Sequence, residues 1–141
     1  MSKNKFYLNS FTWGLPMTVI GLAAMLILTA AGKRPSRWGY CYHYVVGKGW
    51  GGVNLGFVII TSENPSAHTK SHEHGHALQN CKYGLLMPFI VCIPSFLRYW
   101  YRELRQRIGK PCTTDYDSAW FEGEATAMGD AFMKDYNEVQ K

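Results

Sequence analysis

The feature that most constrains the fold of this chain is an H-E-x-x-H pattern at residues 72–76. On an α-helix, side chains four residues apart lie on one face with Cβ atoms about 5–6 Å apart, so His72 and His76 can converge on one metal ion. Glu73 is rotated by about 100° from His72 and flanks the ion instead of binding it. Its carboxylate can then take a proton from a metal-bound water, as general base. The sequence thus predicts a helix over residues 68–82 that carries one zinc ion.

A third protein ligand has to come from a distant part of the chain, because a catalytic zinc ion takes three protein ligands and keeps one open position. We favour Glu122 among the acidic residues downstream. A last helix is predicted over residues 117–139. On it, small residues stand three, four and seven positions after Glu122, namely Ala125, Thr126 and Gly129. These positions share one helix face. Small side chains there let two helices approach closely, which the short reach of a glutamate to the metal demands.

Other polar side chains surround these residues in the sequence. His68 falls one turn before His72 and faces the same way. We interpret it as a cap or a supporting group, with an extra ligand or a transition-state donor as alternatives. His74 is rotated by about 200° from His72, and we expect it to be structural or solvated. Three acidic neighbours are interpreted as helix caps or solvated charges: Asp115, Asp117 and Glu124.

The N-terminal part of the chain predicts a membrane-spanning helix. Residues 6–31 carry no charged side chain, and residues 11–31 form an apolar segment of about 20 residues, the length that spans a hydrocarbon core. A cleaved signal peptide is the alternative, because small residues at 29–31 resemble a cleavage site. We therefore divide the chain into an N-terminal segment, residues 1–32, and a metal-binding domain, residues 33–141.

The region between this segment and the metal motif is expected to be extended. Residues 40–46 and 57–61 are rich in β-branched and aromatic residues, and a glycine-rich stretch at 47–52 separates them, as in a hairpin. Residues 53–61 are expected to provide an edge strand beside the metal helix. Together with the helices, these strands predict an α+β fold.

A second apolar run, residues 85–97, is shorter than a bilayer span and contains Pro88 and Pro94. One ion cannot be held from both sides of a membrane. If the residues on either side of this run share a metal, the run must re-enter the membrane or be buried in protein.

The net charge of +5 is placed in a way that indicates a membrane and not a nucleic acid. Lysine and arginine cluster directly after the apolar segments, at residues 33–37 and 98–110, as they do on the cytoplasmic side of a bilayer. No RNA-binding aromatic signature or DNA-reading helix pattern accompanies them. We expect an integral membrane protein with a single N-terminal span, its metal site on the cytoplasmic side, and no nucleic-acid partner.

The order of the motifs provides a family resemblance. The runs that carry it are Gly52–Phe57, His72–Asn80, Tyr83–Leu85, Ile93–Ser95 and Trp120–Glu122 with Ala125 and Gly129. The chain resembles the gluzincin class of zinc metallopeptidases and, more closely, small bacterial membrane-embedded minigluzincin-like proteins. The resemblance implies zinc ligation by His72, His76 and Glu122, with Glu73 as general base. One departure stands out, since Thr126 takes a position that is commonly acidic, which weakens a contact to a ligand histidine.

From these features we expect a membrane-anchored zinc metallohydrolase that cleaves a peptide or protein substrate with a zincin-like helical core. Three side chains remain candidates for stabilising the oxyanion of the transition state: Tyr83, Tyr116 and His68. The alternative is a non-catalytic membrane protein in which zinc is structural and His68 fills the fourth position. A membrane module without a metal, and a soluble nucleic-acid binder, are further alternatives.

Overall fold

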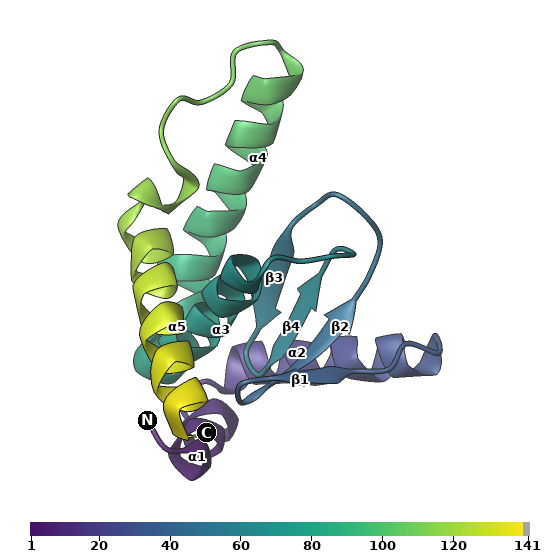
Figure 1. Cartoon of the computed structure of the whole chain (residues 1–141), viewed down its shortest axis with the longest axis vertical. Helices are drawn as coiled ribbons and strands as arrows, with labels where there is room; N and C mark the ends of the chain where they lie inside the picture. The colour runs from purple at the N-terminus through teal and green to yellow at the C-terminus, as the bar shows by residue number, and fades with distance from the viewer. Residues whose placement is uncertain (140–141) are drawn as a thin grey trace.

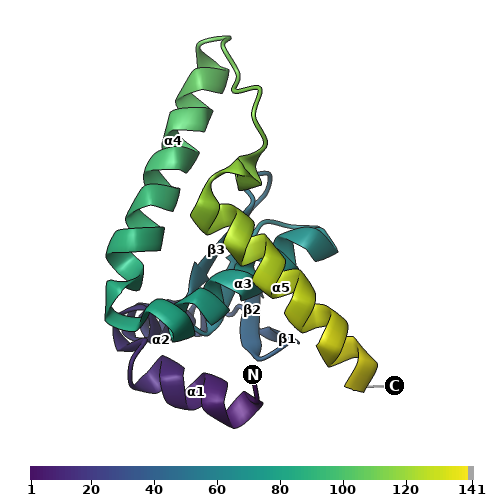
Figure 2. The ribbon, with the colours of Figure 1, turned by 90° about the vertical axis from the view of Figure 1, so that its left-hand side faces the viewer.

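The computed structural model describes residues 1–139, which form five α-helices and one four-stranded sheet (Figures 1 and 2). The α+β prediction is confirmed. The helices are α1 (Lys3–Phe11), α2 (Leu15–Ala30), α3 (Ala67–Tyr83), α4 (Ile93–Arg107) and α5 (Trp120–Val139). The strands are β1 (Ser36–Trp38), β2 (Cys41–Val45), β3 (Gly52–Leu55) and β4 (Val58–Thr61). Short 3₁₀ turns, η1 (Gly84–Leu86) and η3 (Tyr116–Ser118), and one π-helical turn, η2 (Pro88–Cys92), connect the later helices.

The sheet has the order β1-β2-β4-β3, with β2 and β4 parallel and both outer pairs antiparallel. The two predicted strands are present as β2 and β4. The prediction that they form a hairpin is wrong, because they pair in parallel. The glycine-rich stretch leads instead into β3, which forms a hairpin with β4. Gly56 turns this hairpin with a φ of 68°, a conformation that glycine adopts without steric cost. Of the edge strand predicted over residues 53–61, only β3 lies at the end of the sheet, because β4 pairs with β2 on one side and with β3 on the other.

Helix α1, the sheet and α3 share one apolar core. Phe6 from α1, Tyr44 from β2, Val58 and Ile59 from β4, and Leu78 from α3 are buried together. A second cluster joins α2, the η1–η2 segment and α5 through Met17, Met87, Val91 and Phe121. Helix α3 contributes buried residues to the first cluster, and Tyr83 at its end packs against the second, so the helix that carries the metal motif contacts both clusters.

The predicted N-terminal helix is divided in two. Helix α1 ends at Phe11 and α2 begins at Leu15, and their axes differ by 95°. Pro16 lies in the first turn of α2, and its ring would clash with the carbonyl four residues earlier if the helix continued from α1. The side-chain amide of Asn80 donates to the Gly14 carbonyl oxygen at 3.2 Å, which ties this break to α3.

No single helix among the described residues is long and apolar enough to cross a bilayer, which corrects the prediction of one unbroken span over residues 11–31. Two bent pairs of helices have the necessary length and composition only when taken together. They are α1 with α2, and residues 67–86 with residues 88–107, where the bend is 118°. The second apolar run lies at this bend, in η1, η2 and the start of α4.

Helices α3 and α5 cross in close contact through two glycines (Figure 2). A Cβ atom on Gly129 would overlap with the carbonyl oxygen of Ser71, and one on Gly75 would overlap with that of Ala125. Both opposing atoms are backbone atoms, which cannot move aside. The small residues predicted to let two helices approach are thus placed between α3 and α5.

The substitution Gly129→Ala tests this contact. The added methyl group has to push α5 away from α3, so we expect the free energy of unfolding to fall by about 1–3 kcal/mol despite the better helix propensity of alanine. Chemical denaturation followed by circular dichroism measures the change. Asp130→Ala, at an exposed position of the same helix, is the control and should unfold as the original chain does. A Gly129→Ala protein that is as stable as the control would contradict the close contact.

Candidate metal centre

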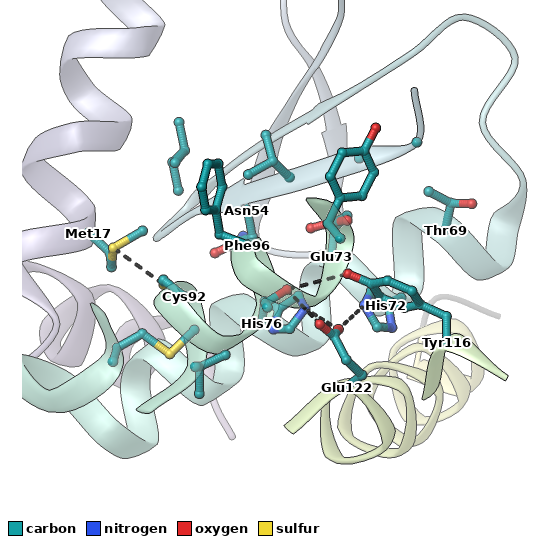
Figure 3. A pocket seen from close by; sticks show the side chains of 18 of the residues that line it. Met17, Asn54, Thr69, His72, Glu73, His76, Cys92, Phe96, Tyr116 and Glu122 are labelled. Carbon is teal, nitrogen blue, oxygen red and sulfur yellow. Dashed lines mark hydrogen bonds and ion pairs between the residues drawn. The ribbon is translucent and has the colours of Figure 1, made fainter. Parts of the chain in front are cut away.

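Two elements bring the predicted ligands to one point. His72 and His76 project from α3, and Glu122 projects from the first turn of α5 (Figure 3). The Nε2 atoms of His72 and His76 lie 3.1 and 3.2 Å from Oε2 of Glu122. The three candidate ligand atoms all lie within 4.8 Å of one another, and all three residues are buried. Among the described residues, this group is the one able to hold a metal ion.

Local structure explains this convergence. Ser66 caps the N-terminus of α3, where its hydroxyl accepts a hydrogen bond from the Thr69 amide at 2.9 Å. The two histidines then follow at a spacing of four residues on the face that meets α5. The tight crossing at Gly75 and Gly129 keeps Glu122 within reach of both rings.

The outer nitrogen of His72 is hydrogen-bonded away from Glu122. Its Nδ1 lies 2.8 Å from Oγ1 of Thr126, and the Thr126 hydroxyl donates to Oδ2 of Asp117 at 2.7 Å. The structure therefore gives Asp117 a contact other than the helix cap that the sequence suggested. It also gives Thr126 a direct contact to a ligand histidine, where the sequence suggested a weakened one.

The outer nitrogen of His76 is bound in a similar way. Its Nδ1 lies 2.8 Å from Oε1 of Gln79, whose amide nitrogen donates to Oε2 of Glu124 at 2.8 Å. Tyr83 and Lys82 also donate to Glu124. Partial burial acts to raise the pKa of Glu124, but these hydrogen bonds hold it below its ordinary value. The interpretation of Glu124 as a solvated charge is wrong, because it supports the Gln79 side chain.

This arrangement fits a metal cation. The hydroxyl of Thr126 and the amide of Gln79 use their hydrogens elsewhere, so both imidazoles donate from Nδ1 and turn Nε2 toward Glu122. Burial acts to raise the pKa of Glu122, yet its contacts with the two rings and Ser95 hold it well below the ordinary value. Two Nε2 atoms and a carboxylate oxygen therefore face one point, where a cation could take the place of the protons that Nε2 otherwise shares with Glu122. Two nitrogen ligands and one oxygen ligand suit a catalytic site with an open position.

Glu73 lies beside this group without joining it. Burial raises the pKa of its carboxyl group, against the influence of His76 and His72, which act to lower it. Its Oε2 atom is buried and has no hydrogen-bond partner among the described residues. The backbone of β3 passes close by, since a Cβ atom on Gly52 would lie 2.7 Å from Oε1 of Glu73. A carboxylate without a partner thus stands between the ligands and the edge strand.

The ligands open onto a pocket of about 980 Å³. Its metal end carries His72, Glu73, His76, Glu122 and Tyr116, and apolar side chains of α2, β3 and α4 form much of the remaining wall (Figure 3). Asn54 from β3 lines the pocket, and both polar atoms of its side chain are buried without a partner among the described residues. The site therefore has room for a substrate, and polar groups that nothing within the described chain satisfies.

The other candidates from the sequence have separate positions. His74 is fully buried, stacks on Phe132 with ring centroids 4.1 Å apart, and accepts a hydrogen bond from the Tyr40 amide. Burial lowers the pKa of His74 to about 4, so the ring is neutral and structural. His68 is largely exposed, with its Nε2 3.7 Å from Oδ2 of Asp117, and it lies outside the ligand group.

Ser95 belongs to one of the runs that carry the family resemblance, but its position in the sequence indicated no role at the site. Its hydroxyl donates to Oε1 of Glu122 at 2.5 Å and lies 3.5 Å from the hydroxyl of Tyr116. Burial raises the pKa of Tyr116 to about 12, so its phenol keeps its proton. A single serine between Pro94 and Phe96 follows no periodic pattern, so only the fold places it against a ligand.

Comparisons of the chain with protein-family models, with curated proteins and with solved structures found no match. The candidate site is therefore defined by its own geometry. That geometry brings His72, His76 and Glu122 together with Glu73 beside them, and leaves His68 and His74 outside the ligand group.

Removal of single ligands tests the metal centre. We expect the protein to retain one divalent ion per chain after dialysis, and His72→Ala and Glu122→Ala to lose it, because two ligands do not complete the site. Elemental analysis of the purified proteins measures this. His68→Ala, which alters an exposed ring on the same helix, should keep the ion. Metal retained by Glu122→Ala at the level of the original chain would contradict the proposed ligand set.

Proposed function

We propose that this protein is a membrane-anchored zinc-dependent metallohydrolase of the gluzincin type, and that it acts as a peptidase. The observation that carries the proposal is the buried group of His72, His76 and Glu122 at one end of a large pocket, with Glu73 beside it, whose Oε2 has no partner within the described part of the chain. A zinc ion held there supplies a Lewis acid that polarises a carbonyl group and makes a water molecule more acidic. The protein's own side chains transfer the protons and stabilise the transition state.

Glu73 is the proposed general base. Its carboxylate accepts the proton of the attacking water, and the same carboxyl group returns a proton to the leaving amine. None of the described residues hydrogen-bonds to its Oε2 atom, so none of them competes for that oxygen.

Tyr116 is the proposed donor to the oxyanion that develops on the substrate. Of the three candidates from the sequence, Tyr83 donates its hydroxyl to Glu124, and His68 is largely exposed. Tyr116 lines the pocket, and its hydroxyl is near Ser95, which contacts Glu122. A phenol that keeps its proton can donate a hydrogen bond to a developing negative charge.

An extended peptide is the proposed substrate. Strand β3 lies at the end of the sheet and lines the pocket beside the ligands, so its outer edge can pair with a peptide as an added strand. Asn54, on the same strand, lines the pocket, and its buried amide has no hydrogen-bond partner among the described residues. These groups favour a peptide over a small ester.

A lipid bilayer is the proposed partner of α2 and α4. Large apolar side chains are exposed along both helices, among them Leu26 and Ile27 on α2, and Phe89, Leu97 and Leu104 in the segment that ends with α4. Arginines follow on α4, as expected where a helix meets charged headgroups. We propose that α2 and the η2–α4 segment anchor the chain and that the site faces the cytoplasm.

Catalysis is tested with Glu73→Gln. The amide cannot act as a base, so we expect cleavage of a peptide library to fall by at least about 100-fold while zinc content is unchanged. Mass spectrometry of the products and elemental analysis give the two readouts. Glu63→Gln, in an exposed loop, is the matched control. Equal cleavage by the Glu73→Gln protein would exclude this mechanism, and zinc binding without any cleavage would favour a structural metal site.

Membrane attachment is tested by replacing exposed apolar side chains of α2. Leu26→Ser combined with Ile27→Ser should reduce the fraction of protein that floats with anionic liposomes, because less apolar area enters the lipid. Lys134→Ser combined with Asp135→Ser on α5 is the control and should float as the original chain does. A protein that stays in the aqueous fraction before any substitution would exclude the bilayer as a partner.

A further inference from the structure

A chain of two hydrogen bonds links a ligand histidine to a carboxylate from another segment. Nδ1 of His72 lies 2.8 Å from the hydroxyl of Thr126, and that hydroxyl donates to Oδ2 of Asp117 at 2.7 Å. The direct distance from Nδ1 of His72 to Oδ1 of Asp117 is 3.9 Å, too long for a hydrogen bond. The threonine is therefore the connecting group.

The direction of this chain follows from the number of hydrogens. A threonine hydroxyl has one hydrogen, and here it points to Asp117, so its oxygen accepts the hydrogen of the imidazole. The ring is then protonated on Nδ1, and Nε2, which faces Glu122, is the nitrogen left to bind a metal ion. A carboxylate at the end of the chain strengthens both bonds and makes the ring a better electron donor.

We infer that Asp117, acting through the Thr126 hydroxyl, is a positioning residue that fixes the orientation and tautomer of His72 for metal binding. This inference depends on the proposed metal site. In the family that the sequence resembles, an acidic residue commonly stands at the position of Thr126. In this chain the carboxylate comes from η3, and the threonine spans the remaining gap.

The carboxylate of Asp117 is held in place by its neighbours. The guanidinium of Arg98 donates to the backbone oxygens of Asp115 and Tyr116 and to the hydroxyl of Ser118, at 2.9 to 3.1 Å. These bonds fix the short segment in which Asp117 lies. His68 also faces this carboxylate, with its Nε2 3.7 Å from Oδ2. A surface aspartate on a free loop would have neither restraint.

The second ligand histidine also has a chain of two hydrogen bonds that leads to a carboxylate. His76 contacts Gln79, and Gln79 donates to Glu124, so one neutral side chain again separates the ring from a carboxylate. Each ligand ring is therefore connected, through one side chain, to a carboxylate that does not touch the metal position. The two arms come from different segments, since Glu124 belongs to α5 and Asp117 to η3.

Zinc affinity of the full-length protein tests the inference, measured by competition with a chromophoric chelator. Asp117→Asn and Thr126→Val should each weaken zinc binding by about 10–100-fold. Because both substitutions break one chain, the double variant should bind no more weakly than the weaker single variant. Thr126→Ser keeps the hydroxyl and should bind zinc as the original chain does. Asp115→Asn is the matched control, since Asp115 contributes only its backbone oxygen here.

A rescue separates this role from a general effect on folding. Thr126→Asp combined with Asp117→Asn places a carboxylate directly beside His72, and it should recover affinity that Asp117→Asn alone has lost. The visible absorption spectrum of the cobalt-substituted proteins gives an independent signature of the ligand geometry, which should change in Thr126→Val and return in Thr126→Ser. If Asp117→Asn and Asp115→Asn bind zinc with equal affinity, this inference is overturned and the proposed function is unaffected. Failure of the original chain to bind zinc would overturn the proposed function with it.

Discussion

The close crossing of α3 and α5 is the constraint on which the rest of the structure depends. Gly75 and Gly129 bring the two backbones together where a single methyl group would collide with a carbonyl oxygen. Helix α3 alone offers two imidazoles on one face, and α5 alone offers an isolated carboxylate. Only at this distance does Glu122 reach both rings, and only then does Thr126 meet the outer nitrogen of His72.

The polar network around the site compensates for its burial. A buried charged or polar group is costly unless it has partners, and here the ligands Glu122, His72 and His76 have them. Glu73 and Asn54 are the exceptions, because each has a buried polar atom without a partner among the described residues. Both line the pocket, where a water molecule or a substrate can supply what the chain does not.

The arrangement of the apolar segments follows from the same site. Helix α2 and the η2–α4 segment line the pocket on one side and expose large apolar side chains on the other. The axis of α2 differs from that of α1 by 95°, and residues 88–107 are bent by 118° from residues 67–86, so neither apolar segment continues the helix that precedes it. Ser95, in the second bent segment, contacts Glu122 directly, so this segment is part of the metal centre as well as its cover.

The sequence by itself determined the metal motif, the helices that carry it and the choice of Glu122, because side-chain spacing on a helix is a local property. It also predicted the two runs that became β2 and β4, but it treated residues 53–61 as one edge strand, which the structure divides into β3 and β4. Only the tertiary structure decided that β2 and β4 pair in parallel, that the N-terminal helix breaks before Pro16, and that Asp117 and Glu124 support the ligands. Strand pairing and hydrogen bonds between distant segments depend on packing, which no short pattern in the sequence records.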